Sequence, residues 1–181
     1  CSSDLLDEAY ALVSTGAKND FGLVAIDTLL ARMENDRDRL VVIIAGYSSD
    51  IDRLLEANDG LRSRFATRIE FESYSPEEIV EIAKVIAKSN DSAIDDEAAK
   101  HVLEAATTLY QHELNGKPAI DIAGNGRYAR QLVEAGEQAR DMRLARSMDI
   151  ESLSVEALGE ITGDDMASAI SGVHRRLNIG E

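Results

Sequence analysis

Several residue types are scarce in this chain of 181 residues, and each shortage excludes a class of protein. Tryptophan is absent and aromatic residues make up only 4%, so a folded core has to be mostly aliphatic. The single cysteine, Cys1, excludes a disulfide within the chain, which fits a reducing compartment. No apolar run approaches the roughly 20 residues that span a bilayer, and no signal peptide begins the chain. We therefore expect a cytoplasmic protein without membrane insertion.

Positive charge is also in short supply. Lysine and arginine number 19 against 34 aspartates and glutamates, which gives a net charge of −15. Such a surface repels phosphate backbones and anionic lipids, so we predict no nucleic-acid partner. Hydrophobic residues still reach 44%, which is enough to build a core and excludes wholesale disorder. A local basic site that faces a nucleotide remains compatible with this composition.

The pattern of apolar residues changes near position 75. Before it, strands and helices alternate; we predict helices at 22–34 and 50–57 and strands at 40–46 and 67–73. The run at 40–46 is continuous and β-branched, which is typical of a parallel strand covered on both faces. After it, only helices are predicted, at 95–110, 125–146, 163–177 and from Ser75 onward.

Two helix starts carry capping signals. Ser75 is followed by Pro76 and by Glu78, which together predict a capping box with proline in the first turn. Asp164 is expected to cap the last helix. We therefore divide the chain into residues 1–74, an α/β part; residues 75–146, a helical part; and residues 147–181, a C-terminal helical extension that begins with a loose connection at 147–162.

An apolar pair followed by two acids opens the chain at Leu5-Leu6-Asp7-Glu8. If a strand ends there, the two carboxylates diverge, so that one can orient Mg²⁺ or its waters and the other an attacking water. The dipeptide alone fits better with two acids that simply begin a solvated helix.

Two arginines, Arg62 and Arg64, lie between the apolar residues Leu61 and Phe65. The planar guanidinium suits phosphate recognition and charge stabilisation across an interface. On their own, such arginines are more often surface charges that balance an acidic chain.

A glycine-rich turn, Gly124-Asn125-Gly126-Arg127, precedes a long predicted helix, with Arg130 one turn later. Glycine lets the backbone approach a ligand, and a helix N-terminus favours anions. A dinucleotide-binding reading is rejected, because no strand precedes this turn. The histidines have no metal-ligand spacing and no cysteine partners; they are His101, His112 and His174.

The order of these features resembles the AAA+ ATPases, and within them the CbxX/CfxQ group. The resemblance runs from position 7 to about 146 and is carried by these stretches: Asp-Glu-Ala-Tyr-Ala-Leu (7–12), Val-Val-Ile-Ile-Ala-Gly-Tyr (41–47), Gly-Leu-Arg-Ser-Arg-Phe (60–65) and Gly-Asn-Gly-Arg-Tyr (124–128). It is strongest to the cytosolic ATPases of mycobacterial type VII (ESX) secretion systems. The implied fold is a partial AAA+ P-loop NTPase parallel sheet followed by an α-helical lid domain.

The resemblance implies roles at matching positions. Asp7 and Glu8 take the place of the Walker B pair: Asp7 would hold Mg²⁺ through water, and Glu8 would polarise the water that attacks the γ-phosphate. Tyr47 or Ser48 would be the sensor 1 residue at the tip of the strand at 40–46.

The arginines have family counterparts as well. Arg64 matches the arginine finger that enters a neighbouring subunit, with Arg62 as second choice, and Arg127 matches sensor 2, with Arg130 able to substitute. The implied cofactors are ATP and Mg²⁺, and the implied assembly is a homo-oligomer, a hexameric ring.

The phosphate-binding loop G-x-x-x-x-G-K-[ST] is not found in this sequence. The one Gly-Lys pair, Gly116-Lys117, is followed by Pro118. Without such a loop the chain has no cluster of backbone amides for the phosphates. We expect the chain to be the C-terminal part of an ATPase and to be inactive alone.

Two functions follow from the resemblance, and a third is favoured by the missing phosphate-binding loop. The preferred one is an ATPase that remodels secreted-protein clients or components of a type VII secretion system. A red-type rubisco activase would have the same chemistry with another client. A non-catalytic helical interaction module, with a vestigial acid pair, is the third.

Overall fold

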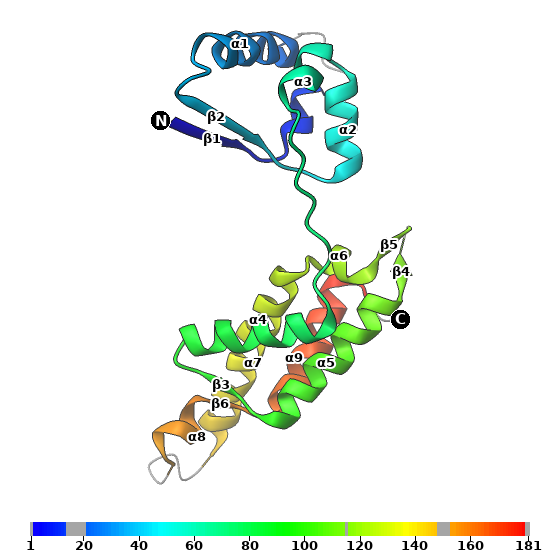
Figure 1. Ribbon diagram of the computed structural model, residues 1–181. Coiled ribbons are helices and arrows are strands. Elements are labelled where there is room, and N and C mark those ends of the chain that lie inside the picture. The colour runs from blue at the N-terminus through cyan, green and yellow to red at the C-terminus, as the bar shows by residue number, and fades with distance from the viewer. Residues whose placement is uncertain (1, 14–20, 115, 148–152, 180–181) are drawn as a thin grey trace. The chain divides into compact units, whose positions relative to one another are not determined.

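The computed structural model describes residues 2–13, 21–114, 116–147 and 153–179. Contacts divide the chain into two units, Cys1–Phe71 and Glu72–Glu181 (Figure 1). The first unit contains strands and helices, and the second is almost entirely helical. The predicted order of an α/β part followed by a helical part is confirmed.

The first unit is built on two parallel strands. Its elements are β1 (Ser2–Leu6), the 3-10 helix η1 (Ala9–Val13), α1 (Phe21–Asn35), β2 (Leu40–Ile44), α2 (Ser48–Glu56) and α3 (Asp59–Arg64). β1 pairs with β2 so that Leu6 lies opposite Ile44, and the Ala45 N–H donates to the Leu6 carbonyl oxygen at 2.9 Å. Both strands therefore end at the same edge of the sheet.

A small core holds this unit together. Its buried residues are Ala9, Ile26, Leu54 and Leu61, which come from η1, α1, α2 and α3. Phe65, directly after α3, packs against the same cluster. Burial of these aliphatic side chains stabilises the unit. Leu61 in this cluster packs α3 against the other helices of the unit.

One face of the sheet is open in the described residues. Val41 and Ile43 are 55% and 51% exposed, and Leu5 is 66% exposed, while the alternate residues of β2 are partly covered. The prediction of a strand covered on both faces is therefore wrong for this structure. A β-branched run indicates a strand, but the number of layers on that strand depends on elements elsewhere.

The strand predicted at 67–73 is also absent. Residues 65–75 contain neither helix nor strand, and Ile69 and Phe71 are 74% and 92% exposed. Alternation of apolar and polar residues is typical of a strand, but a strand forms only where a neighbouring strand completes its backbone hydrogen bonds. No described strand lies beside this segment.

The second unit contains four long helices and several short elements. The long helices are α4 (Pro76–Ser89), α5 (Asp96–Gln111), α7 (Gly126–Arg146) and α9 (Gly163–Leu177), and the short helices are α6 (Ala119–Ala123) and α8 (Val155–Gly159). This confirms the four predicted helices. Short strands, which the periodicity did not predict, pair as β3 (Ala93–Ile94) with β6 (Glu160–Ile161) and β4 (Glu113–Leu114) with β5 (Lys117–Pro118). α8 and β6 lie within 147–162, where a loose connection was expected.

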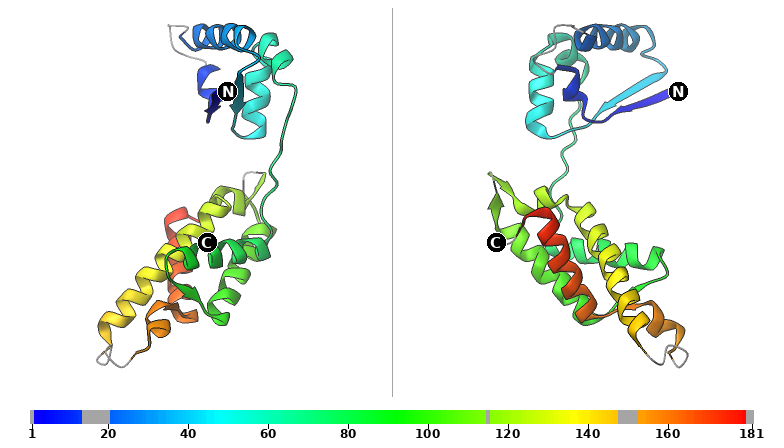
Figure 2. Two further views of the ribbon diagram at one scale, coloured as in Figure 1. Left: turned by 60° about the vertical axis from the view of Figure 1, so that its left-hand side comes forward. Right: turned by 180° about the vertical axis from the view of Figure 1, so that it is seen from behind.

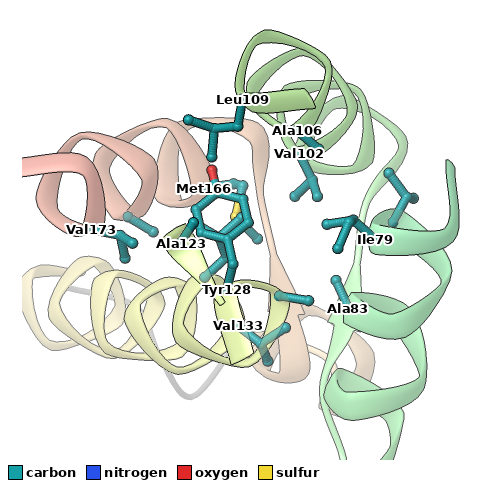
Figure 3. Close-up of a cluster of buried hydrophobic side chains, with 14 of the residues drawn as sticks. Ile79, Ala83, Val102, Ala106, Leu109, Ala123, Tyr128, Val133, Met166 and Val173 are labelled. Carbon is teal, nitrogen blue, oxygen red and sulfur yellow. The ribbon is translucent and has the colours of Figure 1, made fainter. Parts of the chain in front are cut away.

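Four helices share a single core. α9 packs along α7 and α5, and α4 packs on α5 and α7 (Figure 2). Tyr128 lies fully buried in the middle of this core, among aliphatic residues of all four helices (Figure 3). Its hydroxyl lies 2.8 Å from His174 Nε2. The division at residue 146 stays a prediction, although α9 beyond it contributes buried side chains to this same core.

The capping signals are partly confirmed. Ser75 and Glu78 form the predicted capping box, with the Ser75 N–H donating to Glu78 Oε2 at 2.8 Å. At α9 the predicted cap, Asp164, is wrong. Thr162 is the N-cap, and its N–H and hydroxyl donate to Asp165 Oδ2 at 3.1 and 2.9 Å. A capping box requires partners three residues apart, and Thr162 and Asp165 satisfy that spacing.

Candidate functional site

The two acids stand at the edge where both parallel strands end. We call this the carboxyl edge; it comprises Asp7, Glu8 and residues 45–48. Asp7 Oδ1 accepts the Glu8 N–H at 2.9 Å, and Glu8 has a positive φ of 51°. Both acids are exposed. The chain thus turns sharply after β1 and leaves two carboxylates facing solvent beside the end of β2.

Two tyrosines share this edge. The charge of Glu8 raises the pKa of the Tyr10 phenol; burial adds to this, and Asp50, Tyr47 and Asp7 act in the same direction. A Cβ on Gly46 would lie 3.8 Å from Tyr10 Cδ1, so the ring lies beside the end of β2. The sequence analysis did not single out Tyr10, although it lies within the stretch 7–12.

The sensor 1 candidates stand at the same edge. Tyr47 is the N-cap of α2 and is 61% exposed, and Ser48 is the first residue of that helix and is exposed too. The Asp50 and Ile51 N–H groups both donate to the Tyr47 carbonyl oxygen at 2.9 Å. The choice between these two residues stays open.

The arginine pair lies on α3, whose start is fixed by Asn58. Asn58 Oδ1 accepts the Gly60 N–H at 2.8 Å and the Leu61 N–H at 3.3 Å, so α3 begins with a side-chain cap. Arg64 Nη2 lies 2.9 Å from Glu34 Oε2 at the end of α1. The Arg62 guanidinium lies 4.0 Å from Glu56 Oε1.

The two arginines therefore differ in their surroundings. The side chain of Arg64 is 34% exposed, whereas that of Arg62 is 62% exposed. Glu34 is a partner that sequence reasoning missed, because it is 30 residues away from Arg64. An exposed ion pair contributes little to stability, so the contact with Glu34 orients the Arg64 side chain only weakly.

In the second unit, Arg127 and Arg130 lie in the first two turns of α7 and are exposed. Gly124 has a φ of 94°, and a Cβ there would lie 3.3 Å from Arg127 Cβ, so the turn brings Arg127 close to the backbone of Gly124. Neither arginine makes an ion pair within the described ranges of the chain. Both are available to an anion at the N-terminus of a 21-residue helix.

The structure thus gathers Asp7, Glu8, Tyr47 and Ser48 at one edge. It places Arg62 and Arg64 on a separate helix of the same unit, and Arg127 and Arg130 in the second unit. The roles assigned to all eight residues stay predictions.

The donor atoms at the carboxyl edge suit Mg²⁺. Carboxylate oxygens are the ligands that this hard cation prefers, and it keeps several waters and is usually bound by only one or two carboxylates. Among the described residues, no group of three or more His, Cys, Asp or Glu side chains could hold a metal ion. The two carboxylates at this edge match the number that Mg²⁺ usually takes from a protein.

A separate hollow of about 300 Å³ lies on the second unit between α5 and α9. Its lining includes His101, Glu104, Thr108 and His174, none of which belongs to the predicted site. In the parts of the chain that the structure describes, no helix combines the length and apolar character of a membrane span.

The chain is similar to known proteins along almost its whole length. The AAA lid domain family matches residues 75–176. The ESX-1 secretion system protein EccA1 of Mycolicibacterium smegmatis is 77% identical over 178 residues, which cover 97% of this chain and 31% of that protein. EccA1 of Mycobacterium tuberculosis is 66% identical over the same span.

A second kind of relative is more distant. The ESX-3 secretion system protein EccA3 of Mycobacterium tuberculosis is 53% identical over 182 residues, which cover 96% of this chain and 29% of that protein. The chain spans about a third of the length of the curated relatives it matches. The predicted resemblance to AAA+ proteins of the type VII secretion group is confirmed.

Proposed function

Since the chain belongs to the AAA lid domain family, we propose that it is the C-terminal part of a AAA+ ATPase that remodels proteins for a type VII (ESX) secretion system. One observation carries the proposal. The acid pair leaves the end of a parallel strand beside the end of its neighbour, in a chain whose other unit matches a AAA lid. Nucleotides bind outside the carboxyl ends of strands in α/β sheets.

The acid pair would divide its work. Asp7 would orient a hydrated Mg²⁺ through its carboxylate, and Glu8 would polarise the water that attacks the γ-phosphate. When Mg-ATP is bound, the metal neutralises the charge that develops on the phosphates. The positive φ of Glu8 marks a sharp turn between the two acids, which would allow their side chains to take different tasks.

The arginines would complete the site. Arg64, or Arg62, would reach the nucleotide of a neighbouring subunit, and such a finger contributes about 10³–10⁵ in rate. Arg127 or Arg130 would meet the γ-phosphate from the lid. A finger in trans requires heterologous interfaces that close into a ring, and we propose a hexamer.

The names of the relatives support a proposal for the client and the location. EccA1 and EccA3 are named as secretion system proteins, so we propose secreted proteins or secretion-system components as clients, and a cytoplasmic site of action. The rubisco activase alternative has no such relative among those named above.

The substitution Glu8→Gln in the full-length protein tests the proposal. It keeps the shape of the side chain but removes the carboxylate that polarises water, so ATP should bind and remain unhydrolysed. Nucleotide retention and phosphate release measure this. Asp38→Asn, an exposed acid next to β2, is the control and should hydrolyse ATP normally. Normal phosphate release by Glu8→Gln would contradict the proposed role.

A further inference from the structure

Asn125, in the turn before α7, has a backbone conformation that is unusual for a residue with a side chain. Its φ and ψ are 52° and −115°, and it follows Gly124, whose φ is 94°. A non-glycine residue persists there only where its surroundings determine it strongly. Such strain indicates that contacts of the Asn125 side chain hold the backbone in this conformation.

That side chain connects two distant segments. Asn125 Oδ1 accepts the Tyr74 N–H at 3.1 Å, and Asn125 Nδ2 donates to Asp121 Oδ1 at 2.7 Å. The Ser73 hydroxyl donates to the same Asp121 oxygen at 2.5 Å. We call these four residues, Ser73, Tyr74, Asp121 and Asn125, the clasp. It joins segments about 50 residues apart at the point where the chain passes α6 and enters α4 (Figure 1).

The clasp joins the segment that enters α4 to the turn that precedes Arg127. Tyr74 directly precedes Ser75, which caps α4, and Asn125 lies two residues before Arg127. On the other side of the connection, Arg68 lies 2.6 Å from Asp52 and 2.8 Å from Glu70.

The residues between these two anchors are less constrained. Within the described residues, Ile69, Phe71 and Glu72 make no hydrogen bond or ion pair. The division between the two units falls in the same stretch, after Phe71.

We infer that Asn125 is a positioning residue for Arg127: the clasp joins the entry of the helical unit and the turn that bears Arg127 into one rigid piece. A displacement of the residues that enter α4 is then passed directly to the turn before Arg127. This inference rests on the proposed function, because Arg127 meets a nucleotide only in an ATPase.

The first experiment measures the clasp in this chain. Asn125→Gly relieves the strained backbone, because glycine adopts positive φ freely, and removes the two hydrogen bonds that the Asn125 side chain makes in the clasp. Exchange of the Tyr74 amide hydrogen should become about tenfold faster, as expected for one lost hydrogen bond. Asn178→Gly is the matched control: Asn178 also has a positive φ, 51°, and lies outside the clasp. Unchanged Tyr74 exchange in Asn125→Gly would overturn the inference.

The second experiment tests whether Asn125 acts through Arg127. In the full-length ATPase, Asn125→Gly should lower kcat about tenfold if it removes one hydrogen bond's worth of positioning. In an Arg127→Ala background it should have no further effect, because residues that act as a unit are not additive. Additive losses, or a normal kcat in Asn125→Gly, would overturn the positioning role. If the unmodified full-length protein does not hydrolyse ATP, the proposed function fails, while amide exchange still decides whether the clasp exists.

Discussion

At the scale of single residues, neighbours decide what each charged group can do. Arg62 and Arg64 lie two residues apart on the same short helix. Arg64 lies 2.9 Å from Glu34, whereas Arg62 lies 4.0 Å from Glu56. Two arginines in one motif are therefore not equivalent, and a comparison between them is a sensitive test.

We expect Arg64→Ala in the full-length ATPase to lower kcat by about 10³-fold or more, because a finger stabilises charge in the transition state. ATP binding should remain, since the proposed finger would act on the site of a neighbouring subunit. Arg62→Ala is the matched control and should retain most of the activity. The assignment reverses if Arg62→Ala abolishes turnover and Arg64→Ala does not; binding and steady-state kinetics distinguish the two.

A pH dependence is expected from His174. Burial lowers the pKa of this histidine, whose Nε2 lies 2.8 Å from the hydroxyl of buried Tyr128; His101 and Glu104 face it from α5. The unfolded chain takes up a proton near its ordinary pKa of about 6.5, while the folded chain does so only at lower pH. The contribution of His174 to the free energy of unfolding is therefore full above a pH of about 6.5. It is lost as the pH falls from there through the lower pKa of His174 in the folded chain.

Urea unfolding at pH 8 and pH 5 measures this dependence. His174→Gln keeps an acceptor for Tyr128 but does not titrate, so its unfolding should depend less on pH. His112→Gln, at an exposed position, should leave the dependence as it is. An equal pH dependence in His174→Gln and the unmodified chain would contradict the assignment.

At the scale of elements, α9 shows how a helix end is joined to its neighbours. Burial raises the pKa of the Asp165 carboxyl, but hydrogen bonds from Arg143 and Thr162 outweigh it and lower the pKa overall. The Arg143 guanidinium, on α7, lies 2.8 Å from Asp165 Oδ2, and the Asp165 residue is only 4% exposed. The same carboxylate therefore caps α9 and ties it to α7.

Asp165→Asn should destabilise the helical unit by about 2 kcal/mol, because the bond of a buried carboxylate to Arg143 and a helix capping box are weakened together. The neighbouring exposed acid offers a control, and Asp164→Asn should change stability by less than about 0.5 kcal/mol. Chemical denaturation measures both. A larger effect for Asp164→Asn would show that the cap had been assigned to the wrong acid.

At the scale of the whole molecule, this chain holds an acid pair and arginines but no phosphate-binding loop in its sequence. We predict that calorimetry will find no micromolar affinity of the 181-residue chain for Mg-ATP, because its sequence lacks the loop whose backbone amides would cradle the phosphates. The full-length protein serves as the positive control. Micromolar binding by the chain alone would mean that another surface of it recognises the nucleotide.

The local sequence was sufficient for features that depend on near neighbours. Helix periodicity predicted α4, α5, α7 and α9, and the spacing of Ser75 and Glu78 predicted their capping box. These features are encoded within a few residues, so a short window of sequence contains the information that determines them. The position of the acid pair at the end of a strand was expected from the family resemblance, whereas the dipeptide alone favoured the start of a solvated helix.

Only the tertiary structure decided the features that depend on distant partners. Ile69 and Phe71 alternate like a strand but have no described strand beside them, and Val41 and Ile43 have no described layer over them. Arg64 finds Glu34 across 30 residues and Tyr74 finds Asn125 across 51. A ladder, a covering layer or a long-range hydrogen bond needs a partner whose position is set by the packing of the whole chain, and no local pattern specifies that partner.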